Sequence, residues 1–108
     1  AAEAYYYRAH QNHKNKDYEK SNEVIALLSQ KFSSQPHWAA KSLLLMAQNF
    51  YAVKDAFQAT YILESLIENY KQFPEISKQG ETLLNQIKQE QAEQNASLSQ
   101  SDNNNEVQ

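Results

Sequence analysis

The stretch AAKSLLLMA at residues 39–47 decides the fold, because a related stretch, AAEAYYYRA, occupies residues 1–9. The two align at a shift of 38 residues, which superimposes three alanines and sets three tyrosines on three leucines. The same shift pairs further positions along the chain: Lys16 with Lys54, Asp17 with Asp55, Phe32 with Tyr70, and Pro36 with Pro74. Self-similarity at a fixed period predicts a chain built from stacked units.

The composition narrows the classes of fold and chemistry that the chain can have. Among 108 residues there is one glycine, Gly80, and no cysteine. Tight β-turns and phosphate-binding loops both require glycine, so the sequence argues against a β-rich fold and against nucleotide-binding loops. The lack of cysteine excludes disulfides, thiolate metal sites and cysteine nucleophiles. The composition therefore favours an all-α protein.

Capping and breaker residues divide the chain into five expected helices. Aspartate is a favoured N-cap, and Asp17 and Asp55 each precede a segment with apolar residues at helical spacing. Proline is favoured in the first helical turn, so Pro36 and Pro74 mark two further helix starts. The expected helices cover residues 1–14, 18–32, 36–53, 56–71 and 74–94. Inside the last of them, Gly80 indicates a close contact between helices.

Two helices in each repeated unit predict stacked helical hairpins, because one hairpin cannot bury its apolar stripe alone. Residues 1–94 are then one domain, with a first hairpin at 1–34, a second at 35–72 and a capping helix at 73–94. Residues 95–108 are too polar to bury, so we expect a flexible C-terminal tail there.

The pattern of large, small and aromatic positions resembles that of the tetratricopeptide repeat (TPR) family. In the second hairpin the pattern is carried by Leu43, Ala47, Phe50, Lys54, Asp55, Ala59, Leu63, Leu66 and Tyr70. In the first hairpin it is carried by Tyr5, Ala9, Lys16, Asp17, Tyr18, Ser21, Ile25, Leu28 and Phe32. The first hairpin departs from the family at Asn12, where an aromatic residue is usual, and at Arg8, where leucine is usual. The unit is also longer than the family's repeat of about 34 residues.

The resemblance implies an all-α, right-handed superhelical stack of antiparallel helical hairpins, a TPR-like α-solenoid. The segment ENYKQFPEISKQGETLLNQI (68–87) is also similar to C-terminal repeat segments of bacterial cell-envelope proteins, including outer-membrane assembly lipoproteins. We therefore expect a piece of a longer multi-repeat protein, located in the periplasm or at the outer membrane. Because no apolar run is long enough to span a bilayer, we expect no membrane insertion by this segment.

Partners of TPR proteins bind the concave surface that the first helix of each hairpin lines. Carried over to this chain, the resemblance places the partner-binding groove at Tyr6, His10, His13, Lys41, Leu44, Gln48 and Tyr51. Family members that clamp a C-terminal carboxylate need lysine and asparagine at the positions of Tyr6 and His10, so that mode of binding is not expected. An aromatic, amide-rich groove with one lysine instead suits an extended or helical peptide of a partner, bound by ring stacking and amide hydrogen bonds.

Catalytic, metal and nucleic-acid functions have weaker support in the sequence. His10 and His13 share one helix face, but a metal site needs a third or fourth ligand. Glu19 and Glu23 are four residues apart, a spacing that a solvated helix face explains. The net charge of −3 argues against nucleic acid as a partner. We therefore expect no enzyme activity, no metal and no cofactor.

The sequence as a whole predicts a non-catalytic protein–protein interaction module. The alternative is a structural spacer or self-association unit, in which the face of the first helix docks on neighbouring repeats or on a second copy of the chain. Trp38, at the start of the third expected helix, has two interpretations: it anchors the long inter-unit loop by packing, or it is an exposed anchor for a partner.

Overall fold

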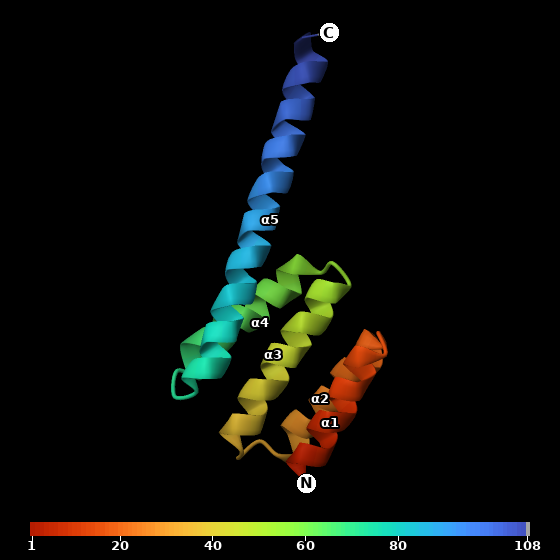
Figure 1. Cartoon of the computed structure of the whole chain (residues 1–108), viewed down its shortest axis with the longest axis vertical. Coiled ribbons are helices and arrows are strands. Elements are labelled where there is room, and N and C mark those ends of the chain that lie inside the picture. Colours follow the sequence, from red (N-terminus) through yellow and green to blue (C-terminus); the bar gives the residue numbers. More distant parts are fainter. Residues whose placement is uncertain (108) are drawn as a thin grey trace.

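The structure, a computed structural model, describes the backbone of residues 1–107 and the side chains of residues 1–99. Over those residues the chain is all-helical, with five α-helices and no strand (Figure 1). The helices are α1 (Ala2–Lys14), α2 (Tyr18–Lys31), α3 (Pro36–Ala52), α4 (Ala56–Asn69) and α5 (Pro74–Val107). α1 packs on α2 as hairpin 1, α3 packs on α4 as hairpin 2, and α5 packs on hairpin 2. The prediction of an all-α fold with helical hairpins is confirmed.

The turns that follow α1 and α3 have the same local structure. After α1, the backbone N–H of Lys16 donates to the carbonyl of His13 at 3.0 Å. The N–H of Asp17 donates to the carbonyl of Asn12 at 2.8 Å, which completes a Schellman motif. Lys54 holds the corresponding position after α3, and the φ angles of Lys16 and Lys54 are 65° and 66°. This left-handed conformation favours glycine, so each lysine holds it at a cost in free energy.

Aspartate begins the second helix of each hairpin, as the sequence predicts. The Asp17 side chain accepts a hydrogen bond from the backbone N–H of Lys20, at the start of α2. The Asp55 side chain accepts the equivalent bond from Gln58 at the start of α4. Each bond satisfies one of the amide groups that a helix start leaves without an intrahelical partner.

Small residues occupy completely buried positions between the packed helices. Four alanines of the core are completely buried: Ala9, Ala40, Ala47 and Ala59. Gly80 has the same role between α5 and α4, because a Cβ atom there would lie 3.1 Å from Cδ2 of Leu66. The close helix contact that we expect at Gly80 is therefore confirmed.

α5 differs from the expectation at its C-terminal end. The sequence predicts that this helix ends near Gln94, yet its backbone is helical to Val107, while Gln108 lies outside the described residues. No proline or glycine interrupts the chain after Gly80, so the helix continues although residues 91–99 are all exposed. Despite this length, none of the described helices is apolar enough over a sufficient span to cross a membrane.

We predict that Lys54→Gly stabilises the protein, since glycine adopts the left-handed conformation without the steric cost of a Cβ atom. The free energy of unfolding should rise by about 1 kcal/mol, which corresponds to an increase in Tm of roughly 4–8 °C. Thermal unfolding followed by circular dichroism measures the change. Lys20→Gly, on the exposed face of α2, is the control and should lower Tm, because glycine costs about 1 kcal/mol inside a helix. A fall in Tm for Lys54→Gly would contradict this account of the turn.

Candidate functional site

One group of side chains joins the first helices of the two hairpins. Nζ of Lys41, on α3, lies 4.7 Å from the ring centroid of Tyr6, on α1, and 5.2 Å from that of Trp38. The rings of Tyr6 and Trp38 are 5.6 Å apart, and the ring of His10 stacks on Tyr6 at 6.0 Å. We call these four residues the aromatic–lysine cluster. It presents ring faces and a cation at a half-buried surface, which are groups that bind ligands by stacking and cation–π contact.

The surroundings of the cluster disfavour additional positive charge. Burial lowers the pKa of His10 below its ordinary value of 6.5, and repulsion between its charged form and the basic groups of Lys14, His13 and Lys41 lowers this pKa further. Burial also raises the pKa of Tyr6 above 10.0, so the phenol keeps its proton. At neutral pH both rings are therefore uncharged and available for stacking.

The two hairpins are joined in their interior by a hydrogen-bonded network around Asn49. The Asn49 side chain is completely buried, and its Nδ2 donates to Oγ of Ser21 and to Oδ1 of Asn22, both at 2.8 Å. Oγ of Ser21 in turn donates to the carbonyl of Ala9 at 2.7 Å. Oδ1 of Asn49 can only accept, so Nδ1 of His13, 2.6 Å away, carries the hydrogen of that bond. The network connects α1, α2 and α3, and it fixes the tautomer of His13.

The equivalent positions in the next interface are apolar. Ala59 and Ile87 lie 38 residues after Ser21 and Asn49, and both are buried in the core between hairpin 2 and α5. The same two structural positions therefore hold a hydrogen-bonded pair in one interface and a hydrophobic pair in the other. A buried polar pair is satisfied in only one arrangement, so it favours a single packing of hairpin 1 on hairpin 2.

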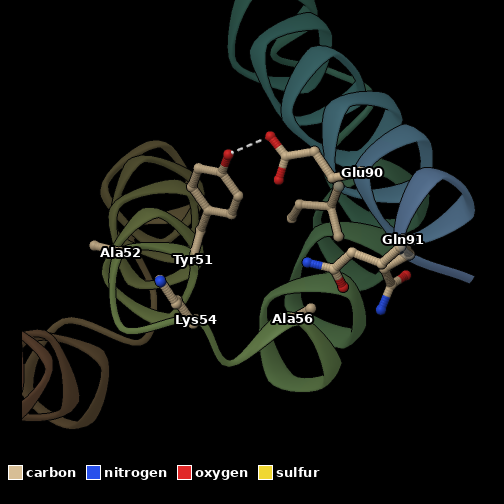
Figure 2. A pocket seen from close by; sticks show the side chains of 8 residues that line it. Tyr51, Ala52, Lys54, Ala56, Glu90 and Gln91 are labelled. Carbon is tan, nitrogen blue, oxygen red and sulfur yellow. Dashed lines mark hydrogen bonds between the residues drawn. The ribbon is translucent and has the colours of Figure 1, made fainter. Parts of the chain in front are cut away.

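A second contact joins α3 to α5. The hydroxyl of Tyr51, on α3, donates to Oε1 of Glu90, on α5, at 2.7 Å (Figure 2). Nε2 of Gln86 donates to the same hydroxyl at 2.9 Å. The bond to the Glu90 carboxylate raises the pKa of Tyr51 above 10.0, and burial and the charge of Glu90 add to the rise. Beside these groups α5 separates from hairpin 2 and leaves a cleft of about 410 Å³. Tyr51 thus holds α5 against α3 at the edge of this cleft.

The structure divides the seven predicted groove residues into three groups. Three of them meet in the aromatic–lysine cluster: Tyr6, His10 and Lys41. Two are tied by side-chain hydrogen bonds to neighbouring helices: His13 and Tyr51. Of the remaining two, Gln48 is half-buried, whereas Leu44 is only 8% exposed and has little surface to offer a partner.

Two residues of the site were not assigned by sequence reasoning. Trp38 had two possible roles, and the structure places its ring half-buried against Tyr6 and Lys41, which combines packing with a partly accessible surface. Asn49 lies outside the predicted groove, although the sequence holds a signal for its role. The 38-residue shift pairs Asn49 with Ile87 and Ser21 with Ala59, so both members of the pair change from polar to apolar together.

Comparison with family models, curated proteins and solved structures finds no match to this chain. Within the described residues, no three or more His, Asp or Glu side chains are grouped so that they could hold a metal ion. The aromatic–lysine cluster offers aromatic rings, an imidazole and the ammonium group of Lys41, with Lys14 close enough to act on His10.

We predict that Asn49→Ala destabilises the fold by about 2–3 kcal/mol, because it leaves His13, Ser21 and Asn22 without their buried partner. Urea unfolding measures the loss. Gln48→Ala, at the adjacent half-buried position, is the control and should change stability by less than about 0.5 kcal/mol.

A double variant tests whether the polar pair can be replaced by its apolar equivalent. Asn49→Ile combined with Ser21→Ala copies the pair found at Ile87 and Ala59. It should be more stable than Asn49→Ile alone, since it removes a buried hydroxyl whose oxygen keeps its bond to the Ala9 carbonyl but loses the hydrogen bond it accepts from Asn49. Equal stability of the single and double variants would show that Ser21 does not depend on Asn49.

We predict that His10 titrates below pH 6.5 in the folded protein and that Lys14→Gln raises its pKa part of the way back, because burial is the larger cause of the shift. The folded state then binds fewer protons than the unfolded state near pH 6.5, so the contribution of His10 to stability is present at higher pH and lost as the pH falls. NMR titration of the imidazole protons measures the pKa. A value of 6.5 or above in the folded chain would contradict the prediction.

Proposed function

We propose that this chain is a non-catalytic protein–protein interaction module, a TPR-like stack of hairpins with a right-handed superhelical arrangement. In this proposal a peptide or protein partner binds the face formed by α1 and α3, with the aromatic–lysine cluster at its centre. A place within a longer repeat protein in the periplasm or at the outer membrane agrees with the family resemblance.

The observation that supports the proposal is the half-buried contact of Lys41 with the rings of Tyr6 and Trp38. Tryptophan and tyrosine are enriched among the residues that contribute most to protein interfaces. Rings held by stacking lose little conformational entropy when a partner binds, so a preformed cluster binds more tightly than freely rotating side chains.

The chemistry of this face suggests which features of a partner it can bind. The ring faces of Tyr6 and Trp38 can stack on aromatic or proline side chains, and the half-buried amide of Gln48 can pair with a peptide backbone. The charges of Lys14 and Lys41 disfavour a cationic segment here, and they are the same charges that lower the pKa of His10. The face is therefore suited to a neutral or acidic segment with rings.

Selection of displayed random peptides on the immobilised chain provides defined ligands for a test. Trp38 is the only tryptophan of the chain, so its emission reports binding at the cluster in a titration. We predict that Tyr6→Ala raises the Kd of selected peptides by about tenfold or more, equivalent to roughly 1.4 kcal/mol. Lys41→Gln, which keeps both rings, should raise the Kd by a smaller factor and also tests the site if Tyr6→Ala impairs folding.

Leu27→Ala is the control, because Leu27 is a 44% exposed apolar residue on α2 that is not a member of the cluster. Its Kd should equal that of the unchanged chain. The proposal is wrong if the selected peptides bind the Tyr6 and Lys41 variants as tightly as the unchanged chain while circular dichroism shows the folded state.

A further inference from the structure

Two grooves lie beside the second helices of the hairpins, and neither is lined by a residue of the aromatic–lysine cluster. The first groove, of about 560 Å³, lies between α2 and the end of α3, and the second, of about 280 Å³, lies between α4 and α5. Five residues of α2 line the first groove: Tyr18, Glu19, Asn22, Glu23 and Ala26. Five residues of α4, each 38 positions later, line the second: Ala56, Phe57, Thr60, Tyr61 and Glu64. The grooves are therefore the same structural position in successive units.

The repeated position carries an unusual amount of exposed apolar surface. Phe57 is 83% exposed and Tyr61 is 72% exposed, both in the second groove. Val53, in the first groove, is 55% exposed. These three are half of the large hydrophobic side chains that are exposed among the described residues. Phe57 and Tyr61 are four residues apart on α4, so their side chains are neighbours, and an exposed apolar pair of this kind marks a site of interaction.

All the charged side chains that line the two grooves are negative. Glu19 and Glu23 lie on the first groove and Glu64 on the second, whereas no lysine, arginine or histidine of the described chain lines either one. Lys20 and Lys54 are close in sequence, but Lys54 lines the cleft beside Tyr51 instead. Carboxylates beside exposed rings form a surface that attracts cations, because the ring faces of Phe57 and Tyr61 also bind ammonium and guanidinium groups.

The two grooves are close enough for one ligand to reach both. Val53 lines the first groove and Ala56 lines the second, and these residues are three positions apart in the turn between α3 and α4. Their Cα atoms are therefore no more than about 11 Å apart. A single short segment can place side chains in the acidic groove and the aromatic groove together.

We propose that these two grooves dock a basic amphipathic segment of a partner protein, with its lysine or arginine side chains toward Glu19 and Glu23 and its apolar side chains on Val53, Phe57 and Tyr61. This surface is separate from the α1–α3 face, which repels cations, so the module holds two partners of opposite chemistry. The grooves act by charge attraction and apolar burial together, and neither contribution suffices alone.

Fluorescence anisotropy with three labelled peptides tests the proposal. The probe is a peptide of leucine and lysine patterned as an amphipathic helix; one comparison peptide has glutamate for lysine, and the other has serine for leucine. We expect the leucine–lysine peptide to bind at least about tenfold more tightly than either comparison peptide at physiological salt. Equal binding of the leucine–lysine and serine–lysine peptides would overturn the proposal, because net charge alone would then account for the attraction.

Paired variants locate the binding. Phe57→Ser with Tyr61→Ser, and separately Glu19→Gln with Glu23→Gln, should each weaken binding about tenfold or more. The matched controls change the same kinds of residue outside the grooves: Leu27→Ser with Leu98→Ser, and Glu81→Gln with Glu93→Gln. We expect both controls to bind like the unchanged chain, and equal losses in controls and groove variants would overturn the proposal.

Two further measurements distinguish binding in the grooves from binding at the aromatic–lysine cluster and from self-association of the chain. Tyr6→Ala should leave binding of the leucine–lysine peptide unchanged, so failure of one binding surface is distinguishable from failure of the other. Sedimentation velocity of the chain alone should show a monomer. A dimer that Phe57→Ser with Tyr61→Ser dissociates would overturn the proposal, since a second copy would then be the natural occupant of the grooves.

Discussion

The arrangement of the hairpins depends on one buried amide, that of Asn49. Its oxygen accepts from His13 on α1, and its nitrogen donates to Ser21 and Asn22 on α2, so a single side chain of α3 sets the position of both helices of hairpin 1. Apolar contacts favour many slightly different packings, whereas this network is complete in only one. The contact of Tyr6 with Lys41 across the same interface exists because that packing brings α1 beside α3.

The repeated unit determines the backbone arrangement, and side-chain differences between equivalent positions of the units determine the chemistry of each interface and groove. The interface between hairpin 2 and α5 uses Ala59 and Ile87 where the first interface uses Ser21 and Asn49, and both are well packed. On the outer surface, Glu19 and Glu23 stand where the next unit has Phe57 and Tyr61. Two copies of one backbone thereby form an acidic and an aromatic groove at equivalent positions of successive units. A scaffold of this type can change its side chains and its ligands without changing its backbone.

Most of the fold could be predicted from the sequence, because the residues that determine it act locally. Asp17 and Asp55 as caps, Pro36 and Pro74 at helix starts, and the 38-residue period each act within a few residues or by simple alignment. The sequence did not predict how far α5 extends at its C-terminal end. Low hydrophobicity indicates that a segment is exposed, but an exposed segment can still be helical. The candidate site could be predicted only in part. The resemblance placed Tyr6 and Lys41 on one face, but the burial of Leu44 and the bonds of His13 and Tyr51 depend on packing between helices distant in sequence.

α5 has the geometry of a lever arm. Gly80 brings its early turns close to α4, and the bond from Tyr51 to Glu90 holds its middle against α3. Val107 lies roughly 17 residues beyond Glu90, which is about 25 Å of helix at 1.5 Å per residue. A tilt of roughly 10° at that bond displaces the far end by about 4 Å, a distance comparable to the separation of neighbouring strands or side chains. A small rearrangement at Tyr51 is therefore magnified at the far end of the helix.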